Sequence, residues 1–151
     1  DKALGAPNAP VTIYEYASLT CGHCAAFHAD GFKHLKQKYI DTGKVRFILR
    51  EFPLDPIAAA GFMLAHCAGE GKYHPMVDLI FAQQRTLLST DKPVDALLSI
   101  VRQAGFTQES FESCLKNQSF YDGVNSVRQR GVEKFKVDST PTFFINGRKY
   151  K

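Results

Sequence analysis

The chain has 151 residues, 44% of them hydrophobic and 23% charged, which is the balance of an ordinary globular protein with one compact core. No apolar run approaches the roughly 18 residues that a membrane-spanning helix needs, so we expect a chain that does not itself span a membrane. The net charge is +4, but the basic residues are dispersed and no nucleic-acid-binding signature accompanies them, so we expect no nucleic-acid partner.

The N-terminal part predicts a lead-in segment followed by a strand–helix–strand unit. Residues 1–10 contain Gly, Pro and Asn at short intervals and predict a loop. Residues 11–16 are β-rich and predict a strand, and apolar residues at helical spacing predict a helix over 21–40. A second β-rich run covers 45–52. This order indicates two parallel, neighbouring strands in an α/β protein.

A series of helices is predicted next, because Pro, Thr and Gly punctuate the helical patterns there. The predicted ranges are 57–68, 75–84, 93–104, 107–115 and 121–135, with Thr107 as the cap of the fourth. A β-rich run over 142–145 is followed by Asn146-Gly147. Asn-Gly between β-forming residues is a strong hairpin signal, so the chain is expected to finish in a hairpin.

Four cysteines, Cys21, Cys24, Cys67 and Cys114, are spread over the chain. An even number in a domain of this size fits an oxidising compartment. Four cysteines allow three pairings, and counting cannot choose among them.

The first two cysteines form the tetrapeptide Cys21-Gly22-His23-Cys24, which follows a predicted strand and opens a predicted helix. This context favours a redox-active pair. The positive end of the helix stabilises a thiolate at Cys21, and a cationic His23 would add to this, so we expect Cys21 to be the exposed attacking sulfur. Cys24, one turn inward, is the expected resolving thiol. Ser18 and Thr20 are candidate helix caps.

Three other interpretations of the pair stay open. The first is a purely structural disulfide between the two cysteines. A zinc site needs four ligands, to which His23 and His28 would have to contribute, and we expect no metal. Covalent haem attachment needs a histidine after the second cysteine, where Ala25 stands, and we expect no cofactor.

These features resemble the thioredoxin superfamily, and within it the bacterial DsbA-like proteins, over nearly the whole chain. The features that carry the resemblance are the strand over 11–16, the Cys21–Cys24 tetrapeptide, the helical block and Thr140-Pro141 before the final hairpin. The resemblance implies a thioredoxin fold with an inserted all-helical domain. The implied domains are residues 1–56 with 136–151, and residues 57–135.

The resemblance also implies roles for single residues. Pro141 matches the cis proline that faces the cysteine pair in this family, and Thr140 would offer backbone groups to a bound peptide. Glu15 matches the family's buried acid, which relays protons to the inner cysteine. Arg50 and Glu51 are candidate partners for that acid.

A second disulfide in the helical block is implied by a subset of the family, and this pairs Cys67 with Cys114. The family fold completes its last hairpin and adds a helix over one face of the sheet. Because the sequence stops at Lys151, and starts at Asp1 with no visible signal peptide, we expect a processed, trimmed or shortened chain. An apolar sheet face would then be uncovered and would invite self-association.

The implied function is disulfide donation to reduced, unfolded secreted proteins in the bacterial periplasm. Cys21 would be attacked and Cys24 released, and a membrane quinone-linked partner of the DsbB type would reoxidise the pair. The chain resembles the DsbA-like proteins, but Gly22-His23 is the dipeptide of protein disulfide isomerase. The expected potential therefore lies between about −120 mV, the value for DsbA, and about −180 mV, the value for protein disulfide isomerase. Alternatives are a disulfide isomerase or reductase of the same fold, and a peptide-binding or chaperone module whose cysteines are structural.

Overall fold

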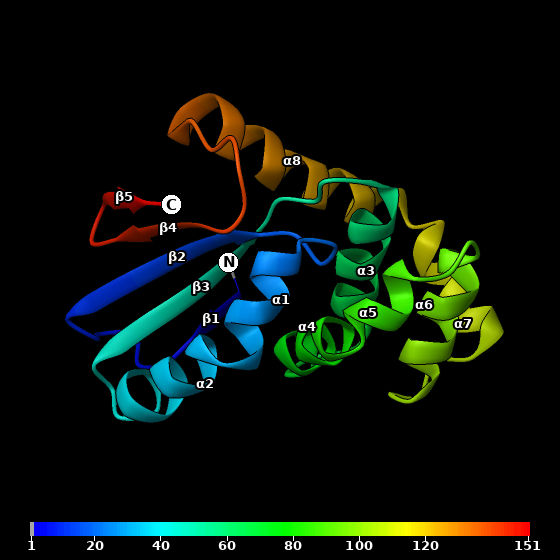
Figure 1. Cartoon of the computed structure of the whole chain (residues 1–151), viewed down its shortest axis with the longest axis horizontal. Helices are drawn as coiled ribbons and strands as arrows, with labels where there is room; N and C mark the ends of the chain where they lie inside the picture. The colour runs from blue at the N-terminus through cyan, green and yellow to red at the C-terminus, as the bar shows by residue number, and fades with distance from the viewer. Residues whose placement is uncertain (1) are drawn as a thin grey trace.

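The structure is a computed structural model that describes residues 2–151. Its five-stranded sheet has the order β1-β3-β2-β4-β5 (Figure 1). The strands are β1 (Lys2–Leu4), β2 (Val11–Ala17), β3 (Val45–Glu51), β4 (Thr142–Ile145) and β5 (Arg148–Tyr150). β2 and β3 are parallel, and the other neighbouring pairs are antiparallel. The predicted α/β class, parallel pair and final hairpin are confirmed.

The prediction of a loop over residues 1–10 is wrong at its start, and Asp1 lies outside the described residues. Lys2 to Leu4 form β1 and pair with β3 at the sheet edge. Three residues are too few to show an alternating pattern, so pairing with β3 rather than local sequence creates this strand. Gly5 then turns the chain at a φ of 93°, where an added Cβ would lie 2.3 Å from the Val45 carbonyl oxygen.

The single helix predicted over 21–40 is divided into three segments. They are α1 (Gly22–Ala29), α2 (Gly31–Leu35) and a π-helical turn, η1 (Lys36–Ile40). The break is at Asp30, whose φ of −132° and ψ of −70° are not helical. The next residue is Gly31, where a Cβ would lie 3.0 Å from the Phe27 ring, so a residue without a side chain allows this close contact.

Six helices lie between β3 and β4, and the predicted helical insertion is confirmed. They are α3 (Pro56–Cys67), α4 (Tyr73–Ala82), α5 (Gln84–Leu88), α6 (Pro93–Arg102), α7 (Gln108–Leu115) and α8 (Gln118–Phe135). Thr107 caps α7 as predicted. The short helix α5 is not predicted from the sequence. Helix α8 begins three residues earlier than predicted, because the Asn117 side chain accepts a hydrogen bond from the Phe120 N–H and caps it.

The two faces of the sheet meet different helices (Figure 1). Glu15 points toward α1, whereas the neighbouring Tyr16 points toward α8, as alternation along a strand requires. On the α8 side, an added Cβ at Gly131 would lie 2.7 Å from the Tyr16 ring, so helix and strand are in close contact there.

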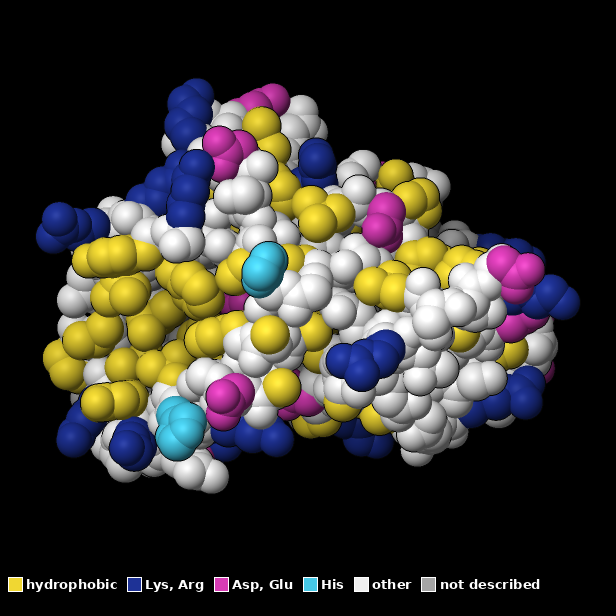
Figure 2. Space-filling model, in the orientation of Figure 1, with side chains coloured by type: hydrophobic (Ala, Val, Ile, Leu, Met, Phe, Trp, Pro, Cys, Tyr) yellow, Lys and Arg dark blue, Asp and Glu magenta, His cyan; other side chains and the backbone are white. Residues whose placement is uncertain are grey.

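One large cluster of buried apolar side chains joins the sheet, α1 and the inserted helices. The helical block therefore packs against both the strands and α1. This packing holds the end of β2 and the start of α1 in place. Hydrophobic side chains also gather on the surface over the end of the molecule that holds the sheet (Figure 2). Within residues 2–151, no helix has the length and apolarity that crossing a membrane requires.

Candidate active site

Cys21 is the N-cap residue of α1. It has an extended backbone, and its Sγ accepts a hydrogen bond from the Cys24 N–H at 3.2 Å. The prediction that Ser18 or Thr20 caps this helix is wrong. The Ser18 hydroxyl instead accepts hydrogen bonds from the N–H groups of Thr20 and Leu54, which tie the loop after β2 to the segment after β3. The reactive sulfur therefore occupies the capping position itself.

The surroundings of Cys21 stabilise its thiolate. The hydrogen bond from the Cys24 thiol lowers the Cys21 pKa most, and hydrogen bonds from the Thr140 hydroxyl and from the amides of Cys24 and His23 lower it further. Together they outweigh burial, which raises the pKa, and bring it to about 5. His23 contributes here through its backbone amide. Cys21 is only 7% exposed, so it is less accessible than the sequence predicts for an attacking sulfur. A pKa of about 5 makes Cys21 a thiolate at neutral pH, although little of its surface is exposed.

Cys24 has the opposite character. It is fully buried on the inward side of α1. The hydrogen bond to Cys21, burial, and the negative charges of Cys21 and Glu15 all raise the Cys24 pKa far above that of a free thiol. In the reduced pair, Cys21 therefore carries the negative charge and Cys24 carries the proton.

The loop before β4 lies against the cysteine pair. The Thr140–Pro141 peptide bond is cis, and the Thr140 carbonyl oxygen lies 3.5 Å from Cys21 Sγ. The antiparallel pairing of β4 with β2 brings these residues together, since Thr142 is opposite Tyr16. Pro141 has no N–H, so it presents no backbone donor beside the sulfur.

Glu15 is fully buried on β2 beneath α1. A 2.7 Å hydrogen bond joins its Oε1 to Nε2 of His28. The prediction that Arg50 or Glu51 is its partner is wrong. Arg50 stacks on the Tyr14 ring at 4.1 Å, and Glu51 accepts a hydrogen bond from the Tyr73 hydroxyl, so both are committed to other groups.

Burial is the largest influence on the Glu15 carboxyl and raises its pKa. The hydrogen bond and charge of His28 oppose this, while the Cys21 charge adds to it. Glu15 can therefore hold a proton nearer to neutral pH than an exposed carboxyl can, which is the property that proton exchange with a buried thiol requires.

Gln84, on α5, is a site residue that the sequence does not reveal. Its buried side-chain amide donates hydrogen bonds to the carbonyl oxygens of Leu19 and Cys21, at 2.8 and 2.9 Å. These bonds fix the loop that presents Cys21. A single Gln within a helical pattern carries no signal of this role, because its partners are more than sixty positions away.

Cys67 and Cys114 form a disulfide that links the end of α3 to α7, with a Cα–Cα distance of 6.2 Å. This is the pairing that the family resemblance implies. Within residues 2–151, no cluster of three or more His, Cys, Asp or Glu side chains has the arrangement of a metal site.

The fold and the cysteine pair at a helix start beside a cis proline are those of a thioredoxin-type protein, and the family model described as Thioredoxin matches residues 1–151, so the chain belongs to the thioredoxin family. Within it the chain is DsbA-like. The crystal structure of alpha-DsbA1 from Wolbachia pipientis superposes with a TM-score of 0.91 at 32% identity, covering 99% of this chain and 82% of that one.

Curated relatives agree with this. A Rickettsia bellii protein described as a protein-disulfide oxidoreductase is 32% identical over 97% of this chain and 57% of its own length. A Bacillus cereus protein described as disulfide bond formation protein D is 28% identical over 97% of this chain and 70% of its own length. The chain spans little more than half the length of the Rickettsia relatives it matches.

Proposed function

We propose that this chain is a thiol–disulfide oxidoreductase in which Cys21 and Cys24 are the catalytic pair. The observation that carries this proposal is the division of charge within the pair, with a stabilised thiolate at the helix cap and a protonated, buried partner. A structural disulfide needs no such asymmetry. The relatives described as protein-disulfide oxidoreductases support the same activity.

The proposed reaction is disulfide donation. A substrate thiolate attacks Sγ of Cys21 in the oxidised pair, the Cys21–Cys24 bond breaks, and Cys24 leaves and takes up a proton. A second substrate thiolate then attacks the substrate sulfur of this mixed disulfide and releases Cys21 as a thiolate. The substrate loses two electrons and gains a disulfide, and the cysteine pair is reduced.

The low pKa of Cys21 supports one direction of electron flow, from the substrate to the cysteine pair. A thiolate that is stable at neutral pH is a good leaving group and stabilises the reduced form, which makes the disulfide a stronger oxidant. This favours an oxidase over a reductase. The proposed substrates are reduced, unfolded secreted proteins in the periplasm, and a membrane quinone-linked protein of the DsbB type is the proposed reoxidant.

The remaining site residues have proposed supporting roles. Thr140 and Pro141 would receive the substrate backbone beside Cys21, and Gly22 leaves space there, since no atom lies within 4 Å of a Cβ added at this position. Glu15 would exchange the proton of Cys24. Residues 57–135 would form a helical domain inserted into a thioredoxin domain of 1–56 and 136–151.

The test is the reduction potential of the pair, measured by equilibration in glutathione buffers with mass-tagging of free thiols. We expect a value between about −120 and −180 mV. A value near −270 mV, that of thioredoxin, would reverse the proposed direction. A pair that glutathione cannot reduce would be structural, and would favour the peptide-binding or chaperone alternative.

A further inference from the structure

A buried histidine connects the carboxyl under the active site to the protein surface. Cys24 and His28 lie one turn apart on the inward face of α1, and both are buried. His28 Nε2 contacts Glu15 Oε1, but the other ring nitrogen, Nδ1, has no hydrogen-bond partner among the described residues. The second carboxyl oxygen of Glu15, Oε2, also lacks one there. A buried polar atom without a hydrogen-bond partner costs free energy, so the two unpartnered atoms, one at each end of this pair, point to a functional role.

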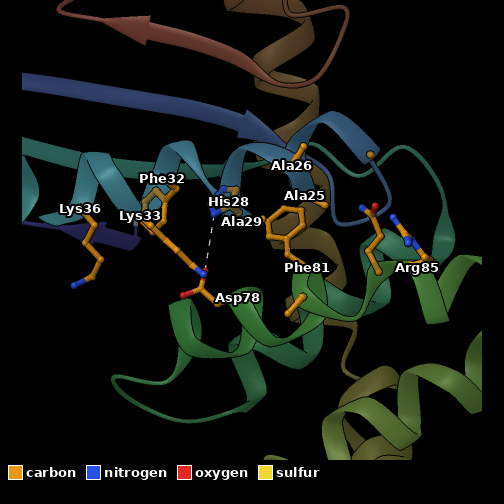
Figure 3. Close-up of a pocket in the computed structure, with 13 residues that line it drawn as sticks. Ala25, Ala26, His28, Ala29, Phe32, Lys33, Lys36, Asp78, Phe81 and Arg85 are labelled. Carbon is orange, nitrogen blue, oxygen red and sulfur yellow. Dashed lines mark ion pairs between the residues drawn. The ribbon is translucent and has the colours of Figure 1, made fainter.

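The outer end of the pair opens on a pocket between α1 and α4 (Figure 3). The pocket has a volume of about 890 Å³, and small side chains such as Ala25 and Ala29 line its α1 wall. Asp78 on α4 points into it, with Oδ1 3.9 Å from His28 Nδ1, and its side chain is 55% exposed. A small movement of Asp78, or a water molecule beside it, would complete a hydrogen bond from this carboxylate to His28 Nδ1.

The proposed exchange reaction needs such an outlet. Cys24 gains a proton when the disulfide is reduced and loses one when it is reformed. Both Cys24 and Glu15 are fully buried, so neither can exchange that proton directly with solvent. Glu15 is near enough for its charge to raise the Cys24 pKa, and its contact with His28 leads toward the pocket.

We propose that Glu15, His28 and Asp78 form a proton path that connects Cys24 to solvent in the pocket between α1 and α4. This inference rests on the proposed function. His28 and Asp78 do not touch the reacting sulfurs, so they are positioning residues that act through Glu15.

The proton transfers balance over a full cycle. During reduction, Glu15 Oε2 gives a proton to the departing Cys24 sulfur, and His28 Nε2 gives one to Glu15 Oε1. His28 Nδ1 then takes a proton from solvent through Asp78, so the ring changes tautomer and keeps its charge. During reoxidation the same steps run in reverse, and the ring returns to its first tautomer.

Titratable and charged groups from the neighbouring elements face this path. They are Glu15 of β2, Lys33 of α2, Lys36 of η1, His74 and Asp78 of α4, and Arg85 of α5 at the pocket rim. Partial burial raises the Asp78 pKa, whereas His28, Lys36 and Lys33 oppose that shift. The two lysines therefore help to keep the outermost carboxyl ionised and ready to accept a proton.

His28 is also a packing residue, and the variants must separate the two roles. Its ring stacks on Phe81 at 4.5 Å between centroids. His28→Phe keeps an aromatic ring but removes both nitrogens. Asp78→Asn changes only the exposed end of the path and leaves the core intact. Asp122→Asn, on the exposed surface of α8, is the matched control for the loss of one surface carboxylate.

The experiment measures the single-turnover rate at which excess small dithiol reduces the oxidised protein, by acid quench and mass-tagging, at low and high imidazole concentration. We expect Asp78→Asn and His28→Phe to slow the reaction by about 3- to 30-fold, less than the roughly 10²–10⁴-fold effect of removing a direct acid–base group. Imidazole should restore the Asp78→Asn rate, because it supplies protons to the pocket. Asp122→Asn should match the wild type.

The outcomes separate this path from the function on which it rests. Wild-type rates for Asp78→Asn, with no dependence on imidazole, would overturn the path and leave the oxidoreductase intact. Slowing by His28→Phe alone would also overturn it, because His28 would then act through packing. A wild-type protein that does not react with the dithiol at all would refute the proposed function, and the path with it.

Discussion

At the scale of single residues, the acidity of Cys21 follows from its place in the chain. Ser and Thr are the usual caps, and both occur just upstream, yet the sulfur accepts the free N–H at the helix start. A sulfur in this position is more stable as a thiolate, because the helix end is positive and its N–H groups need acceptors. The cap and the reactive group are the same atom.

This arrangement predicts how Cys24 controls its partner. Because the Cys24 thiol is the largest influence that lowers the Cys21 pKa, Cys24→Ala should raise it from about 5 by about one to two pH units, the equivalent of one hydrogen bond to a charged group. The pH profile of Cys21 alkylation by iodoacetamide measures this. The reduced wild type should lose reactivity only as the pH falls through about 5, since the thiolate is the reactive form.

The same experiment has a clear contrary result. An unchanged midpoint in Cys24→Ala would mean that the helix end and the Thr140 hydroxyl alone hold the thiolate. A wild-type midpoint near the 9.0 of an ordinary thiol would remove the charge asymmetry on which the proposed function rests.

The residues that can be predicted from the sequence are those whose signal is local. The spacing of Cys21 and Cys24 and their place after a strand are visible in a few consecutive positions. The roles of His28 and Gln84 are not visible in this way. His28 bonds a carboxyl on β2, and Gln84 bonds carbonyl groups just before α1. These partners are far apart in the sequence and come into contact only when the chain folds.

At the scale of elements, α5 holds the active-site loop through one side chain. Gln84→Leu removes two buried hydrogen bonds: the Leu19 carbonyl oxygen loses the Gln84 donor, and the Cys21 carbonyl oxygen keeps the Ala25 N–H. We therefore expect a loss of about 1–3 kcal/mol in the free energy of unfolding. Urea denaturation measures this. The neighbouring Gln83→Leu is the control, because Gln83 bonds only the exposed Gln103 side chain and should change stability little. Equal losses in both variants would contradict the assigned role.

Helix α8 offers a matched pair of glycines. An added methyl at Gly131 would lie 2.7 Å from the Tyr16 ring, so Gly131→Ala should destabilise the fold by about 1–3 kcal/mol. Gly123 has open space at the same position, so Gly123→Ala should stabilise the helix by about 0.5–1 kcal/mol. Thermal unfolding of the two variants should therefore shift in opposite directions. Shifts of the same sign would mean that α8 can move away from the sheet at little cost.

The elements that differ from their predictions are those made by packing rather than by propensity. The edge strand Lys2–Leu4 has no pattern of its own and exists through β3. The break at Asp30 lies inside a run with good helical spacing, and it accompanies the contact between Gly31 and the Phe27 ring. Segments with a clear cap, such as the short helix after Thr107, are predicted correctly because their signals lie within the segment.

At the scale of the whole molecule, the helical block and the sheet share one core, and the Cys67–Cys114 disulfide links α3 to α7 within the block. The bridge closes a loop across 47 positions, for which chain entropy gives an upper figure of about 4 kcal/mol. We expect the double variant Cys67→Ala, Cys114→Ala to lose about 2–4 kcal/mol in the free energy of unfolding by urea.

The same double variant tests whether the bridge also affects the chemistry. None of the groups that lower the Cys21 pKa belongs to α3 or α7, so the alkylation midpoint of Cys21 should stay near 5 while stability falls. Wild-type protein with its Cys21–Cys24 pair reduced and the bridge intact is the control. A shifted midpoint would show that the bridge acts on the pair through the shared core, and Gln84, which joins α5 to the Cys21 loop, would be the first contact to examine.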